Sequence, residues 1–189
     1  FAYEWSPTLS TNILRTTGAA GTSLAPGATG QRKKITKADL ISVYTMLGLM
    51  DIPEGQMYGL IDPQMYGELL EIDDFVDYNK TGKTSALEKG QIGEILGMKF
   101  YKRSKVQVYT NDAPPVKKAV NAATATSDNL SCLFWGESFV RRAEGSVKVL
   151  ADLEKPQYVG SIFNAVVRAG GKYSRTDQKG VVALVQAHA

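Results

Sequence analysis

The sequence contains very few of the residues on which familiar catalytic and metal sites depend. Its 189 residues include one cysteine, Cys132, and one histidine, His188. A single cysteine cannot form an intrachain disulfide, so nothing in the sequence argues for an oxidising compartment. One residue of each kind is also too few for a zinc site with the usual cysteine and histidine ligands. A Ser-His-Asp or Cys-His site would depend on a histidine in a terminus that we expect to be frayed.

Long apolar runs are missing as well. No stretch approaches the roughly 20 apolar residues that cross a bilayer, and the opening "FAYEWSPTLS" has neither the basic start nor the apolar core of a signal peptide. Because the chain begins with Phe1 and not with methionine, we expect it to be a fragment or a processed product. Cys132 lies within the apolar run "LSCLFW", which predicts a buried and inert thiol.

The excess of positive charge is too small to define a nucleic-acid-binding protein, because the formal net charge is only +3. The basic residues are nevertheless clustered in "QRKKITK" and "KFYKRSK". Such clusters can hold phosphate backbones without sequence preference, and they are equally typical of a solvated strand edge. The candidate DNA-facing or subunit-facing basic residues are Arg32, Lys33, Lys34, Lys99, Lys102, Arg103 and Lys105.

One polar stretch, Asn79–Gly90, contains the tripeptide "GKT" around Lys83, which resembles the end of a phosphate-binding loop. The first glycine of that motif would fall where the chain has Asp77, and the preceding residues are acidic and do not form an apolar strand. We therefore favour an exposed loop and keep a phosphate-binding enzyme that uses Lys83 as a minor alternative. A solvated acidic loop is also favoured over a metal site for Asp73, Asp74 and Asp77.

The expected helices and strands indicate an α+β fold, with short helices around a mostly antiparallel sheet. Thr36 is suited to cap a helix that Gly48 and Pro53 end, and Asp62 is suited to cap a second helix that starts with Pro63. A third short helix is expected over residues 137–145. The expected strands cover 57–61, two segments around Gly97, 106–109, 130–135, 146–153 and 180–186, whereas 159–171 is ambiguous between helix and strand. Leu133, Phe134 and Trp135 are expected in the core.

The order of these segments resembles the major capsid proteins of tailed double-stranded-DNA bacteriophages, which have the Hong Kong-type phage capsid fold. The similar pieces are "TKADLISVYTML", "YGLIDPQMYGELLEI", "GQIGEILGMKFYKRS", "LFWGESFVRRAEG" followed by "VKV", and "AVVRAGGKYSRTDQKGVVALV". Together they cover approximately residues 30–187. Each piece alone is weak, but their order and spacing are fairly specific to this family.

The resemblance implies a structural protein without catalytic residues or cofactors, and with neither a membrane nor a small-molecule substrate as partner. It implies hexamers and pentamers of an icosahedral shell in the virion, assembled in the bacterial cytoplasm, with non-specific contact to packaged double-stranded DNA. The expected organisation is a loop-rich peripheral segment over 1–35, a mainly axial domain over 36–156, and closing strands that return to the peripheral domain over 157–189. An encapsulin-like nanocompartment shell protein, which shares the fold, is the alternative.

The family also carries an N-terminal arm, an extended loop and a long spine helix before the similar region. Nothing in residues 1–35 has the pattern of a long helix, so we expect those elements to precede Phe1. We also expect a surface of mixed charge without a large apolar patch. The 189-residue chain alone is therefore expected to be a monomer or small oligomer in dilute solution.

Overall fold

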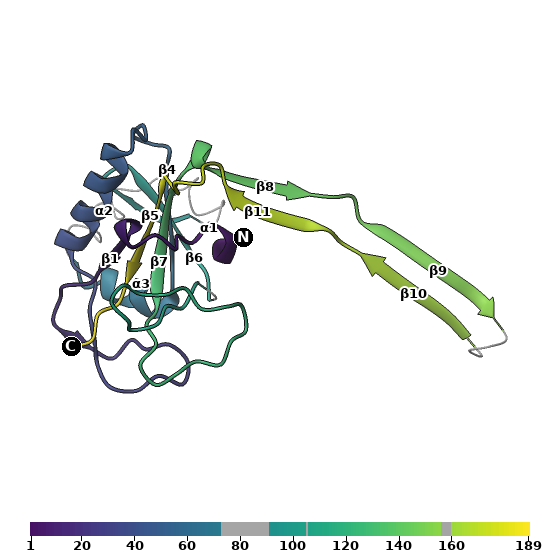
Figure 1. Cartoon of the computed structure of the whole chain (residues 1–189), viewed down its shortest axis with the longest axis horizontal. Coiled ribbons are helices and arrows are strands. Elements are labelled where there is room, and N and C mark those ends of the chain that lie inside the picture. Colours follow the sequence, from purple (N-terminus) through teal and green to yellow (C-terminus); the bar gives the residue numbers. More distant parts are fainter. Residues whose placement is uncertain (73–90, 105, 156–159) are drawn as a thin grey trace.

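The computed structural model describes residues 1–72, 91–104, 106–155 and 160–189, which form a body with a long projecting arm (Figure 1). The stretch Asn79–Gly90 with Lys83, the three acidic residues before it and Lys105 lie outside the described residues, so the predictions about them remain predictions. No helix in the described part of the chain is long and apolar enough to cross a membrane.

The body is built on a six-stranded mixed sheet. The strand order is β1 (Ile13–Arg15), β12 (Val181–Val185), β7 (Ser131–Gly136), β4 (Met57–Ile61), β6 (Met98–Lys102) and β5 (Gln91–Ile95). The pairs β1–β12 and β4–β6 are parallel, and the other neighbours are antiparallel. The mostly antiparallel α+β architecture expected from the sequence is thus confirmed.

Two helices, α2 (Lys37–Leu49) and α3 (Pro63–Leu69), begin at the predicted caps. Thr36 and Asp39 form a reciprocal capping box at α2, and the side chain of Asp62 accepts a hydrogen bond from the backbone N–H of Gln64 at α3. These local bonds satisfy backbone donors that a helix start leaves free, which is why both boundaries could be predicted from sequence.

The main core contains the apolar faces of both helices and one face of the sheet. Leu40 and Leu47 from α2 belong to the same buried cluster as Phe100 and Phe134. The two phenylalanine rings meet edge to face with centroids 6.2 Å apart, and Gly59 lies against both of them. A Cβ atom at Gly59 would stand 2.7 Å from the Phe100 ring, so this position has no room for a side chain.

The N-terminal segment and the loop over residues 106–130 contribute to the second, smaller core. Ile13 and Tyr109 form a buried cluster with Ala183 and Val185 of β12. The N-terminal segment contains α1 (Ala2–Trp5), the 3-10 turn η1 (Ser10–Asn12), β1, β2 (Ala20–Gly21) and β3 (Arg32–Lys33). It is therefore poor in long elements, as expected, but it contributes β1 to the central sheet.

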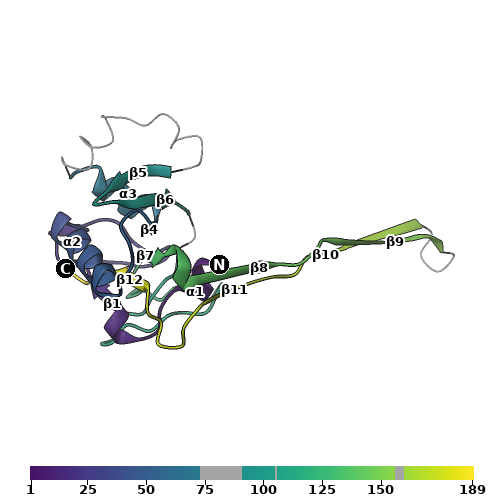
Figure 2. The same cartoon turned by 90° about the horizontal axis from the view of Figure 1, so that it is seen from above.

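The arm is a two-stranded antiparallel ribbon that leaves the body after the 3-10 turn η2 (Glu137–Phe139) (Figures 1 and 2). Its near half pairs β8 (Val140–Glu144) with β11 (Ala169–Tyr173), and its far half pairs β9 (Lys148–Lys155) with β10 (Gly160–Val166). The ambiguous segment 159–171 thus includes strand.

Two secondary-structure predictions are wrong. Residues 137–145 form a helix only over the three residues of η2, because the rest pairs with a strand some 30 residues later in the sequence. Residues 106–109 form no regular strand, and Tyr109 makes only isolated bridges to Lys117 and Asn129. Local patterns could not reveal these distant partners.

Candidate functional site

The single cysteine and the single histidine, which are the reactive side chains that the sequence offers, both make structural contacts. Cys132 is fully buried, its sulfur lies 3.6 Å from that of Met65, and burial raises the pKa of its thiol. The predicted burial of this cysteine is confirmed. The ring of His188 lies 3.0 Å from the carbonyl oxygen of Ser127 and ties the C-terminus to the loop. Within the described ranges, no group of three or more His, Cys, Asp or Glu residues could hold a metal ion.

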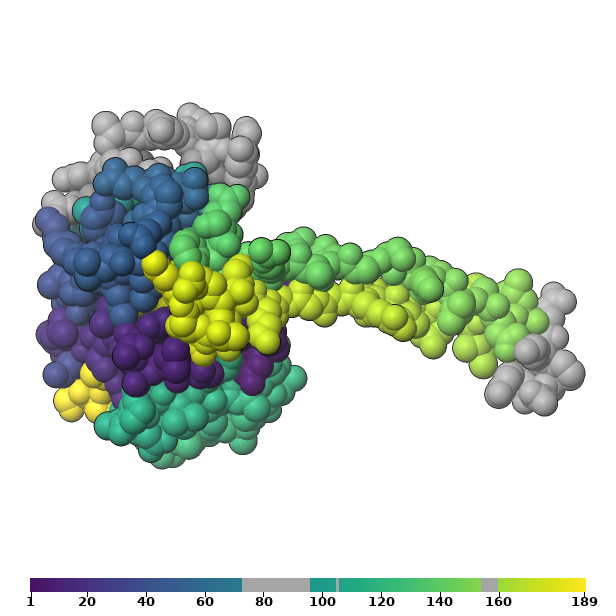
Figure 3. Space-filling model, turned by 45° about the horizontal axis from the view of Figure 1, so that its top comes forward, coloured from purple at the N-terminus to yellow at the C-terminus, as the bar shows by residue number. Residues whose placement is uncertain are grey.

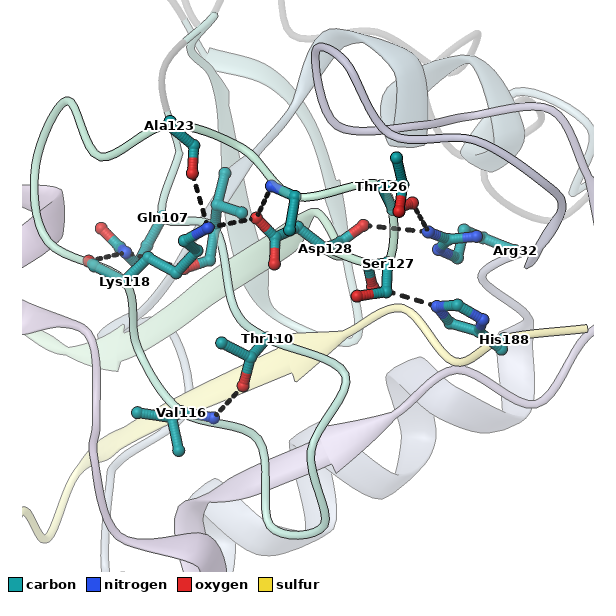
Figure 4. A network of polar contacts seen from close by, with 12 residues as sticks. Arg32, Gln107, Thr110, Val116, Lys118, Ala123, Thr126, Ser127, Asp128 and His188 are labelled. Atoms are coloured by element: carbon teal, nitrogen blue, oxygen red, sulfur yellow. Dashed lines mark hydrogen bonds and ion pairs between the residues drawn. The ribbon is translucent and has the colours of Figure 1, made fainter.

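Arg32 was predicted on the surface, but its side chain is only 1% exposed. The guanidinium donates hydrogen bonds to the side-chain oxygen of Asn129 at 2.6 Å and to the carbonyl oxygens of Thr126 and Asp128 at 3.1 Å each (Figure 4). Burial lowers the pKa of Arg32, and the nearby Asp128 opposes that shift. Arg32 therefore fastens the loop to the body and cannot present its charge to DNA.

The other predicted basic residues in the described part of the chain reach the surface to different extents. Lys34 is paired with Glu71 at 2.7 Å, and this bond raises the pKa of Lys34. Lys99 lies 5.5 Å from the centre of the Tyr58 ring. Lys33 and Lys99 are half-buried, whereas Lys102 and Arg103 at the end of β6 are exposed. These last two are the basic residues most available to a partner.

The loop that Arg32 fastens is ordered by a second buried charge. Asp128 is 1% exposed and accepts hydrogen bonds from the Lys118 ammonium and from the backbone N–H of Ala125, both at 2.6 Å (Figure 4). Gln107 donates to the carbonyl oxygen of Lys118 at 2.6 Å. Buried polar groups that are satisfied in this way fix a chain segment in one arrangement. The loop therefore holds one defined conformation, although it contains little regular secondary structure.

The far half of the arm has one face without described charges, and an opposite face on which the exposed Leu150 and Ile162 stand beside Asn164 and Asp152. Ala151 pairs with Phe163, and Val149 pairs with Ala165, so each pair shares a face of the ribbon. Leu153 follows on the same face by alternation. The three large side chains on this face, Val149, Leu153 and Phe163, are 59–68% exposed.

Sequence analysis did not foresee this exposed face. The alternation of Val147, Val149, Ala151 and Leu153 is visible in the sequence, but the matching residues of β10 lie about ten positions further on. Only the pairing of β9 with β10 brings the two half-patterns onto one face. Figure 3 shows the arm standing away from the body, so the body does not cover it.

Contacts at its base hold the arm in a definite direction. The Trp5 indole N–H donates to the carbonyl oxygen of Arg141 at 3.1 Å, and the Phe1 ring lies under the Arg142 guanidinium at 5.1 Å. A Cβ atom at Gly171 would lie 2.6 Å from the Phe1 ring, so only glycine lets α1 approach so closely. Sequence analysis missed this brace, because nothing in either segment signals the other.

The chain matches the family model described as "Phage capsid protein" over residues 5–186. It is similar to the solved structure titled "Mycobacterium phage Che8", with 17% identity and a TM-score of 0.53 over 97% of this chain and 55% of that one. It also resembles the capsid of cyanophage P-SCSP1u, with 18% identity and a TM-score of 0.57 over 97% of this chain and 55% of that one.

The capsid of Ralstonia phage GP4 is similar at 15% identity and a TM-score of 0.57, over 96% of this chain and 54% of that one. Identities this low show the fold alone. The chain spans about half the length of the capsid proteins that it matches. No curated protein matches it.

Proposed function

Because this chain belongs to the phage capsid protein family, we propose that it is part of a major capsid subunit in the wall of an icosahedral shell around DNA. The observation that carries the proposal is the braced arm, whose apolar face is exposed in the single chain. Large exposed apolar patches mark interaction sites, because covering them removes apolar surface from water. A subunit with many neighbours offers that cover.

In this proposal the subunits form hexamers and pentamers and have no catalytic residues. They assemble in the host cytoplasm and become part of the virion. The proposed domains are a loop-rich peripheral segment over 1–35, a mainly axial domain over 36–156 and closing strands of the peripheral domain over 157–189. The arm crosses the boundary between the last two, because β9 lies in one and β10 in the other.

Expression of the gene that encodes this sequence, followed by electron microscopy of the purified product, tests the proposal. We expect closed particles with sixfold and fivefold clusters, into whose density the body and the arm both fit. Nuclease-protected double-stranded DNA inside native particles would favour the phage capsid, whereas an enclosed enzyme without DNA would favour the nanocompartment alternative. A gene product that never forms closed particles would contradict both.

Non-specific contact with packaged DNA is assigned within this proposal to Lys102 and Arg103, because both are exposed and adjacent. A double alanine variant should bind duplex DNA more weakly and reduce the salt slope of binding, by about 0.9 for each phosphate that the variant no longer neutralises. A double alanine variant of Lys148 and Lys172 on the arm removes the same charge and is the matched control. Equal salt slopes for the two variants would contradict the assignment.

A further inference from the structure

One face of the near half of the arm carries positive charge that the chain does not balance. Arg141 of β8 and Lys172 of β11 stand directly opposite each other, so their side chains share a face of the ribbon. Arg168 lies four positions before Lys172 and therefore on the same face. All three side chains are exposed. We call Arg141, Arg168 and Lys172 the cationic face of the arm.

Nothing in the described part of the chain neutralises this face. Like charges directly opposite each other destabilise a pair of strands. Within the described ranges, no carboxylate forms an ion pair with the cationic face. The Arg141 side chain donates to the neutral Ser174 hydroxyl at 3.3 Å. On the opposite face, Arg142 is paired with Glu144 at 2.9 Å. The near half of the arm thus balances one face and leaves the other available to an anionic partner.

The outer edge of β11 runs beside the cationic face. The backbone N–H of Gly145 donates to the Arg168 carbonyl oxygen at 2.8 Å, so the backbone of Arg168 points toward β8. Because backbone groups alternate in direction along an antiparallel strand, those of Gly170 and Lys172 also point toward β8. The backbone groups that point away from β8 are those of Ala169, Gly171 and Tyr173. Among the described residues, β11 pairs only with β8, so this edge can accept a further strand.

We propose that an acidic segment of another polypeptide chain adds to this edge of β11 as a third strand. Its two carboxylates stand four residues apart, so that one lies beside Lys172 and Arg141 and the other beside Arg168. Four residues of extended chain span about 13 Å. The residue midway between the carboxylates lies beside Gly170, where a Cβ atom would meet nothing within 4 Å. The arm stands away from the body, which gives a second chain access to this edge (Figure 3).

The edge and the charges together favour a peptide over a nucleic acid. An added strand bonds with both the N–H and the C=O groups of an edge, whereas a phosphate backbone offers acceptors and no donors. Three cations neutralise at most about three phosphates, which gives a salt slope of no more than about 2.7. The inference goes beyond the proposed function, because it assigns a site and a ligand chemistry to the arm and does not require shell formation.

Titration of the isotope-labelled chain with short peptides at low salt, followed by nuclear magnetic resonance, tests the proposal. The probe is a heptapeptide with glutamate at its second and sixth positions, alanine at its fourth and threonine elsewhere. Exposed ion pairs are individually weak, so we expect a Kd on the order of 0.1–1 mM. A peptide with both glutamates replaced by glutamine should bind at least about fivefold more weakly, as should one with its two glutamates at adjacent positions. The amides of Ala169, Gly171 and Tyr173 should become protected from hydrogen exchange when the probe binds.

Variants of the chain provide the matched comparison. Arg168→Gln combined with Lys172→Gln should weaken binding of the probe at least about fivefold. Lys37→Gln combined with Lys148→Gln removes the same charge elsewhere and should bind as wild type does, and circular dichroism verifies that both double variants are folded.

Three results would overturn the proposal. They are no saturation by about 5 mM probe, equal binding of the glutamine peptide, and new protection at Gly170 and Lys172 in place of their neighbours. A fourth is weaker binding of duplex DNA by the Arg168 and Lys172 double variant with unchanged binding of the probe, which would assign the cationic face to nucleic acid. None of these measurements depends on closed particles, so this proposal and the proposed function can fail separately.

Discussion

Replacement of Arg32 by alanine should be among the most destabilising changes at a polar position of this protein. The change removes the donors for the Asn129 side-chain oxygen and the Asp128 carbonyl oxygen, both within buried hydrogen bonds. A buried acceptor without a donor costs about 1–3 kcal/mol, and contacts to a charged group lie toward the upper end. We therefore expect a loss of roughly 3–5 kcal/mol in the free energy of unfolding. At about 2–4 °C per kcal/mol, the melting temperature should fall by roughly 10 °C.

Urea denaturation and calorimetry measure the loss, and Arg103→Ala is the matched control. Arg103 carries the same charge in an exposed position, so its removal should change stability by no more than about 0.5 kcal/mol. The loss of stability in Arg32→Lys should lie between those of Arg32→Ala and Arg103→Ala, because lysine keeps the charge but lacks the planar set of donors. Hydrogen exchange of the 106–130 amides should also accelerate in Arg32→Ala. A loss below about 1 kcal/mol, with unchanged exchange in the loop, would refute the role of Arg32 as an anchor.

Three further substitutions test the packing of the core and the pH dependence of stability. Phe134→Ala should cost about 3–5 kcal/mol in urea denaturation, because the ring is fully buried, and an unchanged midpoint would place it outside the core. Gly59→Ala should lower the calorimetric melting temperature, with a cost of about 1–3 kcal/mol, because its Cβ would meet the Phe100 ring at 2.7 Å. Burial raises the pKa of Glu68 from its ordinary 4.5, so ionisation destabilises the folded state. Stability should therefore fall as pH rises from about 4.5 through the raised pKa, and Glu68→Gln should remove that decrease from the pH–stability curve.

The parts of the fold that sequence predicted are those encoded within a few residues. The cap at Thr36 and the Asp62-Pro63 helix start each depend on neighbours no more than three positions away. Leu133 and Phe134 are buried as expected, and Trp135 is half-buried. A strand made of a continuous apolar run is expected where other elements cover both of its faces, so the burial of these residues could be predicted.

The candidate site could not be predicted in the same way, because its features depend on distant partners. Arg32 sits in a basic cluster that looks solvated, yet its acceptors come from residues near 126–129, almost 100 positions later. The segment 140–144 has charged residues typical of a helix surface, but pairing with 169–173 makes it a strand. Charge and periodicity describe a segment, whereas burial depends on what packs against it.

The brace and the exposed face of the arm have linked consequences for assembly. The hydrogen bond of Trp5 to Arg141 and the approach of Phe1 to Gly171 stabilise the base of the arm. Among the described residues, β9 and β10 pair only with each other. Two-stranded ribbons are marginally stable in water, and three or more strands or a covered apolar face are needed for independent stability. The far half of the arm should therefore be the part of the described chain that gains most from a partner. Cover of this face by a neighbouring segment or subunit and ordering of the far half would then reinforce each other, because the cover adds contacts where the single chain has fewest.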